Sequence, residues 1–386
     1  MGGVAVRGAR SRRHRFRGGW VKRSVVGVAV AALLPFGASV AVVVPAAAEE
    51  NPAAFDFLVD SSMGQVKTRI VRAADGNTDR VVYLLDGERA LSTMNGWEIH
   101  TDIPAELAKF NINVVMPVGG QSSFYADWQE PSQILGNTDA GGLLGSDSGS
   151  AVSGWDDQQG KSSTYKWETF LTKDLKSALR DRLGFSTTRN GVFGLSMGGS
   201  AALLLAAYYP EQFVYAGSLS GYLYMSAPGM REALRLAMLA AGGYNIDNLA
   251  AAGSPEWKRL DPYGFAAQLQ ANGTRLYIGS GSAQPASQDL SSFDAVTLGM
   301  PLEAIALANT KAFQTKLADL GYDNVSYDFP SLGLHNWGNW EQMAKRMIPD
   351  MASRIGKPLP AGQKPPGEGQ PPGEGPPPGE GQQPPK

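Results

Sequence analysis

The chain has 386 residues, a formal net charge of −2 and no cysteine. This composition excludes disulfides, thiolate metal sites and thiol nucleophiles, and the near-neutral charge provides no basic field for binding nucleic acid. The length is sufficient for one large globular domain with appendages. No zinc-finger, EF-hand or nucleotide-binding motif occurs, so we expect neither a metal ion nor a soluble cofactor.

Residues 1–48 have the pattern of a secretory signal peptide. An arginine-rich front without acidic residues precedes an apolar run at 25–44, and three alanines at 46–48 offer a small-residue cleavage site. The alternative is an uncleaved membrane anchor, because the apolar run is about long enough to cross a bilayer, although Pro35 interrupts it. Either interpretation predicts a secreted or cell-envelope protein.

Between residues 49 and 356, strand and helix patterns alternate. We expect a mostly parallel central sheet with helices on both faces, since this alternation is typical of α/β proteins. The predicted strands lie at 80–87, 112–120, 190–196, 213–221, 274–282 and 324–331, and the predicted helices at 168–183, 197–210, about 230–241 and 301–320.

Two segments depart from this alternation. Residues 129–163 are rich in Gly, Ser, Asp and Gln, which predicts a long surface loop inserted in the domain. Residues 357–386 repeat proline-glycine-glutamate hexapeptides, which predicts a disordered tail with polyproline II character. We interpret the tail as a solvated spacer, with a docking peptide as the alternative.

The sequence Gly194-Leu195-Ser196-Met197-Gly198 matches G-x-S-x-G at a predicted junction between strand and helix. A tight turn there would lift the Ser196 hydroxyl above the carboxyl end of its strand. It would also place the N–H of Met197 at a helix N-terminus, where an oxyanion could be stabilised. Ser196 is therefore the predicted nucleophile.

The predicted base is His335, the only histidine after Ser196, just beyond the last predicted strand. Serine nucleophiles of this kind use an acid that lies between the serine and the histidine in the chain. Asp289, Asp294 and Glu303 all satisfy that order, and the spacing alone does not choose among them. The acid would hold the imidazole in one tautomer and stabilise its cation.

Several long strings of the sequence resemble the antigen 85 mycolyltransferases of mycobacteria and corynebacteria. The resemblance covers about residues 52–355 and implies an α/β-hydrolase fold and the transfer of mycolic acids between trehalose esters and onto arabinogalactan. The strings are DGERALSTMNGW (86–97), VVMPVGGQSSFYADW (114–128), YKWETFLT (165–172), GLSMGGSAALLLAAYYPEQFVYAGSLSG (194–221), NGTRLYIGSG (272–281) and GLHNW (333–337).

The resemblance assigns Ser196 as nucleophile and His335 as base. The family's acid is a glutamate in a Leu-Glu pair about ten residues before a Phe-Gln pair, and Glu303 has that position within 302–314. The resemblance therefore favours Glu303 as the third catalytic residue.

The same resemblance implies the remaining site residues. Asp86 and Arg89 match family residues that bind the trehalose headgroup, and Trp337 matches a tryptophan near the sugar. The backbone N–H of Glu88 would be the second oxyanion donor, at a position where the family usually has an apolar residue. His100 aligns with a family asparagine that contacts the sugar, although a surface or rim histidine is its simpler interpretation.

The sequence thus predicts a serine-dependent acyltransferase with trehalose mono- and dimycolate and arabinogalactan as substrates in the cell envelope. Two other hypotheses remain open: a secreted carboxylesterase acting on smaller esters, and a wall-binding protein without catalytic activity. The helix around 233–241 is a candidate wall of an acyl groove, with ordinary core packing as the alternative.

Overall fold

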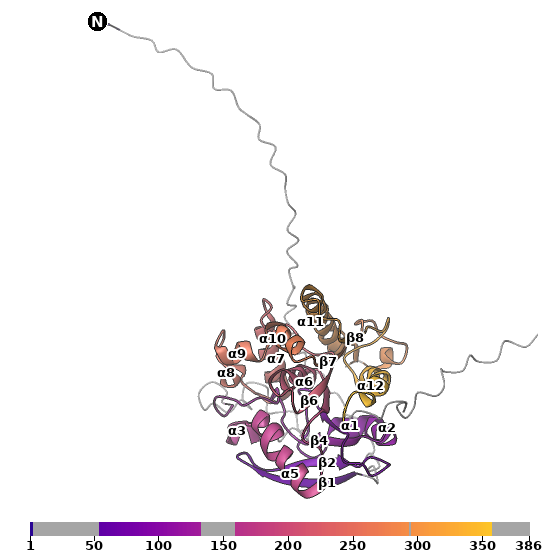
Figure 1. Cartoon of the computed structure of the whole chain (residues 1–386). Coiled ribbons are helices and arrows are strands. Elements are labelled where there is room, and N and C mark those ends of the chain that lie inside the picture. Colours follow the sequence, from indigo (N-terminus) through magenta and orange to yellow (C-terminus); the bar gives the residue numbers. More distant parts are fainter. Residues whose placement is uncertain (3–53, 133–158, 293–294, 357–386) are drawn as a thin grey trace, which may run out of the picture. The chain divides into compact units, whose positions relative to one another are not determined.

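The computed structural model describes residues 1–2, 54–132, 159–292 and 295–356 (Figure 1). Eight strands form one sheet in the order β1-β2-β4-β3-β5-β6-β7-β8. The pairs β1–β2 and β2–β4 are antiparallel, and every later pair is parallel. The strands are β1 (Ala54–Ser61), β2 (Gly64–Val71), β3 (Val81–Leu85), β4 (Asn113–Pro117), β5 (Asn190–Leu195), β6 (Phe213–Leu219), β7 (Arg275–Gly279) and β8 (Val325–Asp328). The predicted fold class, a mostly parallel sheet with helices around it, is confirmed.

Helices cover both faces of the sheet, and each face has its own apolar cluster. One cluster includes residues of α5, α6, α7, α10 and α11, and the other includes residues of α1, α2 and α12, which lie at the right of Figure 1. The longer helical segments are α1 (Gly96–His100), α2 (Ile103–Lys109), α5 (Leu175–Leu183), α6 (Met197–Tyr208), α7 (Met230–Gly242), α9 (Pro255–Arg259), α10 (Pro262–Ala271), α11 (Met300–Asp319) and α12 (Trp337–Ala352). The shorter ones are α3 (Gln159–Ser162), α4 (Trp167–Thr169), α8 (Ile246–Leu249), the π-helical turns η2 (Phe170–Asp174) and η4 (Ala295–Gly299), and the 3-10 turn η3 (Asp289–Ser291).

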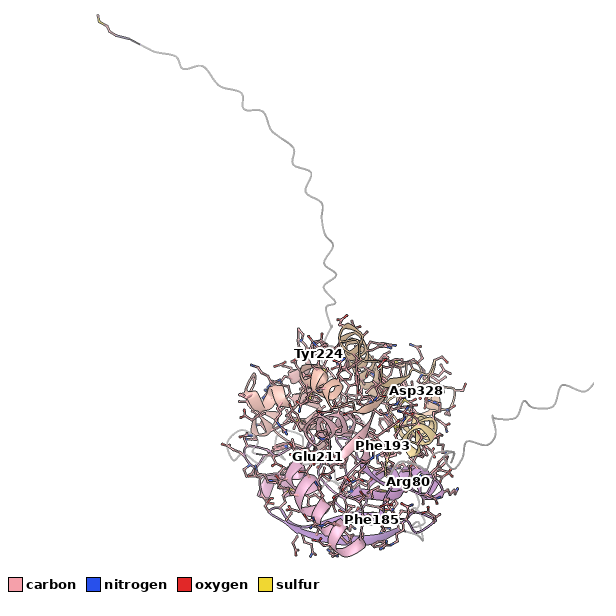
Figure 2. All side chains as sticks on the ribbon, in the orientation of Figure 1. Arg80, Phe185, Phe193, Glu211, Tyr224 and Asp328 are labelled. Atoms are coloured by element: carbon pink, nitrogen blue, oxygen red, sulfur yellow. The ribbon has the colours of Figure 1, made fainter. Side chains whose placement is uncertain are left out.

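The central strand β5 and the helix α6 that follows it are almost completely buried. All six residues of β5 are buried, and α6 is buried from Met197 to Ala207. A helix that is apolar or small all round belongs in the interior, and the alanine- and glycine-rich sequence of α6 allows that close packing. On the other face of β5, Phe193 (labelled in Figure 2) packs edge-on against Trp97, with ring centroids 5.1 Å apart. The start of α6 is therefore held rigidly.

Strands β1 and β2 form a hairpin that our sequence analysis did not predict. The side chains of Phe57 and Val59 are buried and alternate with more exposed neighbours, which is the period of a half-covered strand. Arg69 of β2 forms ion pairs with Asp56 at 2.8 Å and with Glu98 of α1 at 2.7 Å. The hairpin is thus tied to the helix that leads into the candidate site.

Three predicted segments lie wholly or largely outside the described residues: the export signal at 1–48, most of the insertion at 129–163, and the tail at 357–386. The described end of the insertion contains the short helix α3 instead of continuous loop. Within the described residues, no helix combines the length and the hydropathy that a bilayer crossing requires.

Candidate active site

Ser196 occupies a sharp turn between β5 and α6. Its φ is 51° and its ψ is −122°, a backbone conformation that non-glycine residues rarely adopt. The backbone N–H of Ser196 donates to the carbonyl of Leu219 at the end of the neighbouring strand, at 2.8 Å. Such strain persists only where the surroundings enforce it, and it marks Ser196 as a candidate functional residue.

The glycines on either side of Ser196 are required by space. A Cβ atom added to Gly194 would lie 2.6 Å from the carbonyl carbon of Gly198, and one added to Gly198 would lie 2.7 Å from the carbonyl oxygen of Leu85. Gly87 is equally close-packed, since its added Cβ would lie 2.6 Å from Cδ1 of Leu195. The G-x-S-x-G pattern therefore lets the turn approach the loop that follows β3.

The hydroxyl of Ser196 is buried and is hydrogen-bonded to a tyrosine. Ser196 is 3 % exposed, and its Oγ donates to the hydroxyl oxygen of Tyr222 at 3.3 Å. Within the described residues, no hydrogen bond joins Ser196 Oγ to His335. A rotation about χ1 of Ser196 would therefore have to precede proton transfer to the imidazole, and unliganded catalytic sites often show such loose geometry.

Glu303 and His335 form a buried pair. The Nδ1 atom of His335 lies 2.8 Å from Oε2 of Glu303, and the Glu303 side chain is completely buried. The other carboxylate oxygen of Glu303 accepts from Ser220 Oγ at 2.7 Å, from Ser280 Oγ at 3.0 Å and from the N–H of Gly281. Burial alone would raise the pKa of Glu303, but the hydrogen bonds from His335, Ser220 and Ser280 outweigh it and lower that pKa.

The two other candidate acids are not in this position. Asp289 accepts from the side-chain amide of Asn336 at 2.9 Å and from the backbone N–H of Ala286 at 2.8 Å, so it supports the neighbour of His335. Asp294 lies outside the described residues. Among the described acids, Glu303 is the one that contacts the imidazole.

The fold brings Ser196 and the Glu303–His335 pair to the same edge of the sheet. Leu195 and Leu219 are paired across β5 and β6, so Ser196 and Ser220 follow the ends of adjacent strands, which lie about 4.8 Å apart. Ser220 donates to Glu303, and Glu303 holds His335. The serine and the imidazole are therefore both held at the carboxyl edge of the sheet.

The segment after β3 lies against Ser196 and carries the second predicted oxyanion donor. The carbonyl of Glu88 accepts from the N–H of Ser122 at 3.0 Å, which fixes this peptide. Within the described residues, the backbone N–H groups of Glu88 and Met197 donate to no other group. The two predicted oxyanion donors are therefore not engaged elsewhere in that part of the chain.

The side chain of Glu88 is half-buried, with one carboxyl oxygen turned away from solvent. Its Oε1 atom is buried and, within the described residues, has no hydrogen-bond partner. Desolvation raises the pKa of Glu88 to about 8, although the positive charge of Arg89 acts in the opposite direction. Desolvation thus favours the un-ionised form of this carboxyl group.

Asp86 and Trp337 both lie against Gly96 at the start of α1, and His100 contacts Trp337. A Cβ added to Gly96 would lie 2.6 Å from the Trp337 ring and 2.8 Å from Oδ1 of Asp86. The rings of His100 and Trp337 are stacked, with centroids 4.8 Å apart, and desolvation lowers the pKa of His100. Three of the four predicted sugar-binding residues are thus one cluster, and the fourth, Arg89, is exposed on the loop after β3.

The carboxylate of Asp86 already organises its own loop. Its oxygens accept from the N–H of Gly87 at 2.9 Å and from the N–H of Gly96 at 2.6 Å, and the residue is 4 % exposed. Desolvation raises the pKa of Asp86 to about 6, because it outweighs these two hydrogen bonds. Asp86 therefore has a structural role in its own loop in addition to its predicted role as a headgroup ligand.

Sequence reasoning missed the residues that position the predicted ones. Tyr222 accepts from Ser196, Ser220 and Ser280 donate to Glu303, and Trp340 Nε1 donates to Ser220 Oγ at 3.0 Å. Ser220 and Ser280 each follow directly after a strand, β6 and β7, so their position at the carboxyl edge was a usable signal. Tyr222 carried no comparable signal in the sequence.

The sheet and its strand–serine–helix turn are those of the α/β-hydrolase fold. Residues 143–351 match the family model described as "Putative esterase". The crystal structure of MPT51 (FbpC1) from Mycobacterium tuberculosis aligns with a TM-score of 0.63 at 27 % identity, covering 78 % of this chain and 98 % of that one. The Staphylococcus aureus serine hydrolase FphF, with a TM-score of 0.53 at 15 % identity over 78 % of this chain and 98 % of its own, shares the fold.

Comparison with curated relatives identifies the family of this chain within the α/β-hydrolase fold. The chain is 34 % identical to the diacylglycerol acyltransferase/mycolyltransferase Ag85B of Mycolicibacterium smegmatis, over 89 % of this chain and 98 % of that one. It is 39 % identical to Ag85C of Mycobacterium leprae, over 72 % of this chain and 75 % of the relative. The chain belongs to the antigen 85 mycolyltransferase family and is an enzyme of the acyltransferase class.

Proposed function

We propose that this enzyme transfers mycolyl or other long acyl groups between trehalose esters, and to arabinogalactan or another sugar acceptor, through an acyl-enzyme on Ser196. The observation that carries the proposal is the buried Glu303–His335 pair, with 2.8 Å between Oε2 and Nδ1, at the same sheet edge as the Ser196 turn. A serine, an imidazole and a carboxylate in that relation are the parts that acyl transfer requires.

In the first half-reaction, Ser196 Oγ turns from Tyr222 and attacks the carbonyl carbon of the donor ester. His335 takes the serine proton on Nε2, and Glu303 holds the tautomer that leaves Nε2 free to accept it. The electrons of the carbonyl double bond move to oxygen, where the N–H groups of Met197 and Glu88 stabilise the charge. The sugar alcohol then leaves with the proton from His335.

In the second half-reaction, a sugar hydroxyl replaces water as the nucleophile. Transfer exceeds hydrolysis when the sugar is held next to the acyl-enzyme, because binding raises its effective concentration. We assign this role to Arg89, His100 and Trp337, with Asp86. Each carboxylate oxygen of Asp86 has a second lone pair beyond its backbone hydrogen bond, so a sugar hydroxyl can still donate to it.

We also propose that the enzyme acts outside the cytoplasm, at the cell envelope. The support is the pattern of residues 1–48, with an arginine-rich front, an apolar run and a small-residue cleavage site. Sequencing the N-terminus of the protein recovered from the envelope fraction tests this assignment. A chain that begins near Glu49 is expected, and a cytoplasmic chain that begins at Met1 would overturn it.

The function is tested with trehalose monomycolate as the sole substrate, followed by mass spectrometry of the products. We expect trehalose dimycolate and free trehalose from the wild type and neither product from Ser196→Ala. Free mycolic acid without dimycolate would replace the transferase with the carboxylesterase. A wild type that releases nothing, and that a fluorophosphonate probe does not label, would favour a wall-binding protein without catalytic activity.

A further inference from the structure

The hydroxyl of Tyr222 is fixed next to the reacting serine. Ser196 Oγ donates to it at 3.3 Å, and Tyr222 itself is 3 % exposed. The Tyr222 backbone is held by Ser200, whose Oγ accepts from the Tyr222 N–H at 2.9 Å and donates to the Tyr222 carbonyl at 3.1 Å. A phenol hydroxyl is thus positioned in contact with the reacting atom, and the two half-reactions above give it no role.

We propose that Tyr222 is a catalytic residue that donates a hydrogen bond to the oxyanion formed when Ser196 attacks the ester. This inference rests on the proposed function, because it requires Ser196 to be the nucleophile. A donor 3.3 Å from Ser196 Oγ can reach an oxygen bonded to the same tetrahedral carbon.

The chemical step balances without any additional reactant. The Oγ–carbon bond forms, the carbonyl π electrons move to the oxygen, and the Ser196 proton passes to His335. Tyr222 loses the hydrogen bond that it accepted from Ser196, so its own O–H can rotate towards the oxyanion, since hydroxyl hydrogens rotate freely. Tyr222 keeps its proton throughout. When the carbonyl reforms, the ester C–O bond breaks and the alcohol leaves with the proton from His335.

The test compares Tyr222→Phe with Tyr224→Phe by the pre-steady-state burst of p-nitrophenol from p-nitrophenyl butyrate. Tyr224 lies on the same segment and its ring stacks on Tyr263, so its variant loses an equivalent hydroxyl away from Ser196. We expect the acylation rate of Tyr222→Phe to fall about 100-fold, the lower limit for loss of an oxyanion donor, with KM unchanged. An equal or faster burst would overturn the proposal, because Tyr222 would then only restrain the resting serine. Failure of the wild type to release any p-nitrophenol above the level of Ser196→Ala would instead overturn the proposed function.

Discussion

Glu303 and Glu88 are two glutamates with buried carboxyl oxygens in the same site, and their surroundings are opposite. Glu303 receives hydrogen bonds from Ser220, Ser280, Gly281 and His335, and its pKa is lowered despite burial. Glu88 has a buried oxygen that, within the described residues, receives none, and its pKa is raised to about 8.

Burial acts in the same direction on both groups, so the hydrogen bonds decide the charge. Desolvation disfavours a carboxylate, and donors aimed at its oxygens reverse that preference. The fold thereby favours the ionised form of Glu303 beside His335 and the un-ionised form of Glu88. Substitutions at Glu303 and at Glu88 should therefore differ in their effects on activity and on the stability of the fold.

The largest effect should come from Glu303→Gln. The amide cannot stabilise the imidazolium and favours the wrong tautomer of His335, so we expect kcat to fall roughly 10³- to 10⁴-fold. Steady-state hydrolysis of p-nitrophenyl butyrate measures the loss. Asp289→Asn is the matched control, since Asp289 bonds Asn336 at 2.9 Å, and its kcat should change less than about tenfold. A greater loss of kcat in Asp289→Asn than in Glu303→Gln would indicate that Asp289, and not Glu303, is the acid that serves His335.

The two glutamates should also change the stability of the fold with opposite pH dependence. The lowered pKa of Glu303 contributes stability above its unfolded value of about 4.5, and this contribution is lost as the pH falls. The raised pKa of Glu88 contributes stability below about 4.5, which is lost as the pH rises towards about 8. Urea unfolding between about pH 5 and 8 should therefore show Glu88→Gln gaining roughly 1–3 kcal/mol relative to the wild type. A constant difference would mean that Glu88 ionises normally.

A smaller effect is expected from removing one donor to Glu303. Ser220→Ala leaves Ser280 and Gly281 on the same carboxylate oxygen, and it removes the acceptor of Trp340 Nε1. We expect a loss of about 1–2 kcal/mol in stability and up to about tenfold in kcat. Urea unfolding and steady-state kinetics check both values. Full activity would show that two donors suffice to keep Glu303 ionised.

The smallest effect should come from His100, outside both acid environments. His100→Ala removes the ring that stacks on Trp337 at 4.8 Å, an interaction of about 0.5–1.5 kcal/mol. We expect KM for trehalose monomycolate to rise about two- to tenfold, while the burst with p-nitrophenyl butyrate changes less than KM does. A larger change in the burst than in KM would assign His100 to acylation and not to sugar binding.

The sequence predicted the parallel strands and the strained serine well, because both have strong local signals. A run of β-branched residues indicates a buried strand, and G-x-S-x-G between a strand and a helix indicates the sharp turn that carries the serine. The hairpin of β1 and β2 was missed although Phe57 and Val59 alternate with exposed residues, since alternation over so few positions is weak evidence.

The predicted catalytic acid could not be chosen from its spacing in the sequence alone. Asp289 and Glu303 satisfy the same chain order, and only their three-dimensional partners separate them. The environment of the Glu88 carboxyl group could not be predicted from the sequence either, because a missing hydrogen bond depends on every segment that packs against it. The contact of Tyr222 with Ser196 depends on one rotamer, which no sequence pattern specifies.

The pairing of β3 with β5 joins Val82 to Gly191, so most of the N-terminal half of the chain must close into a loop before the serine turn has support. His335 arrives from the opposite end of the chain. Such long sequence separations slow folding and make the last steps cooperative. Covalent labelling of Ser196 should consequently report complete folding, since a partly folded chain would hold the nucleophile without its base.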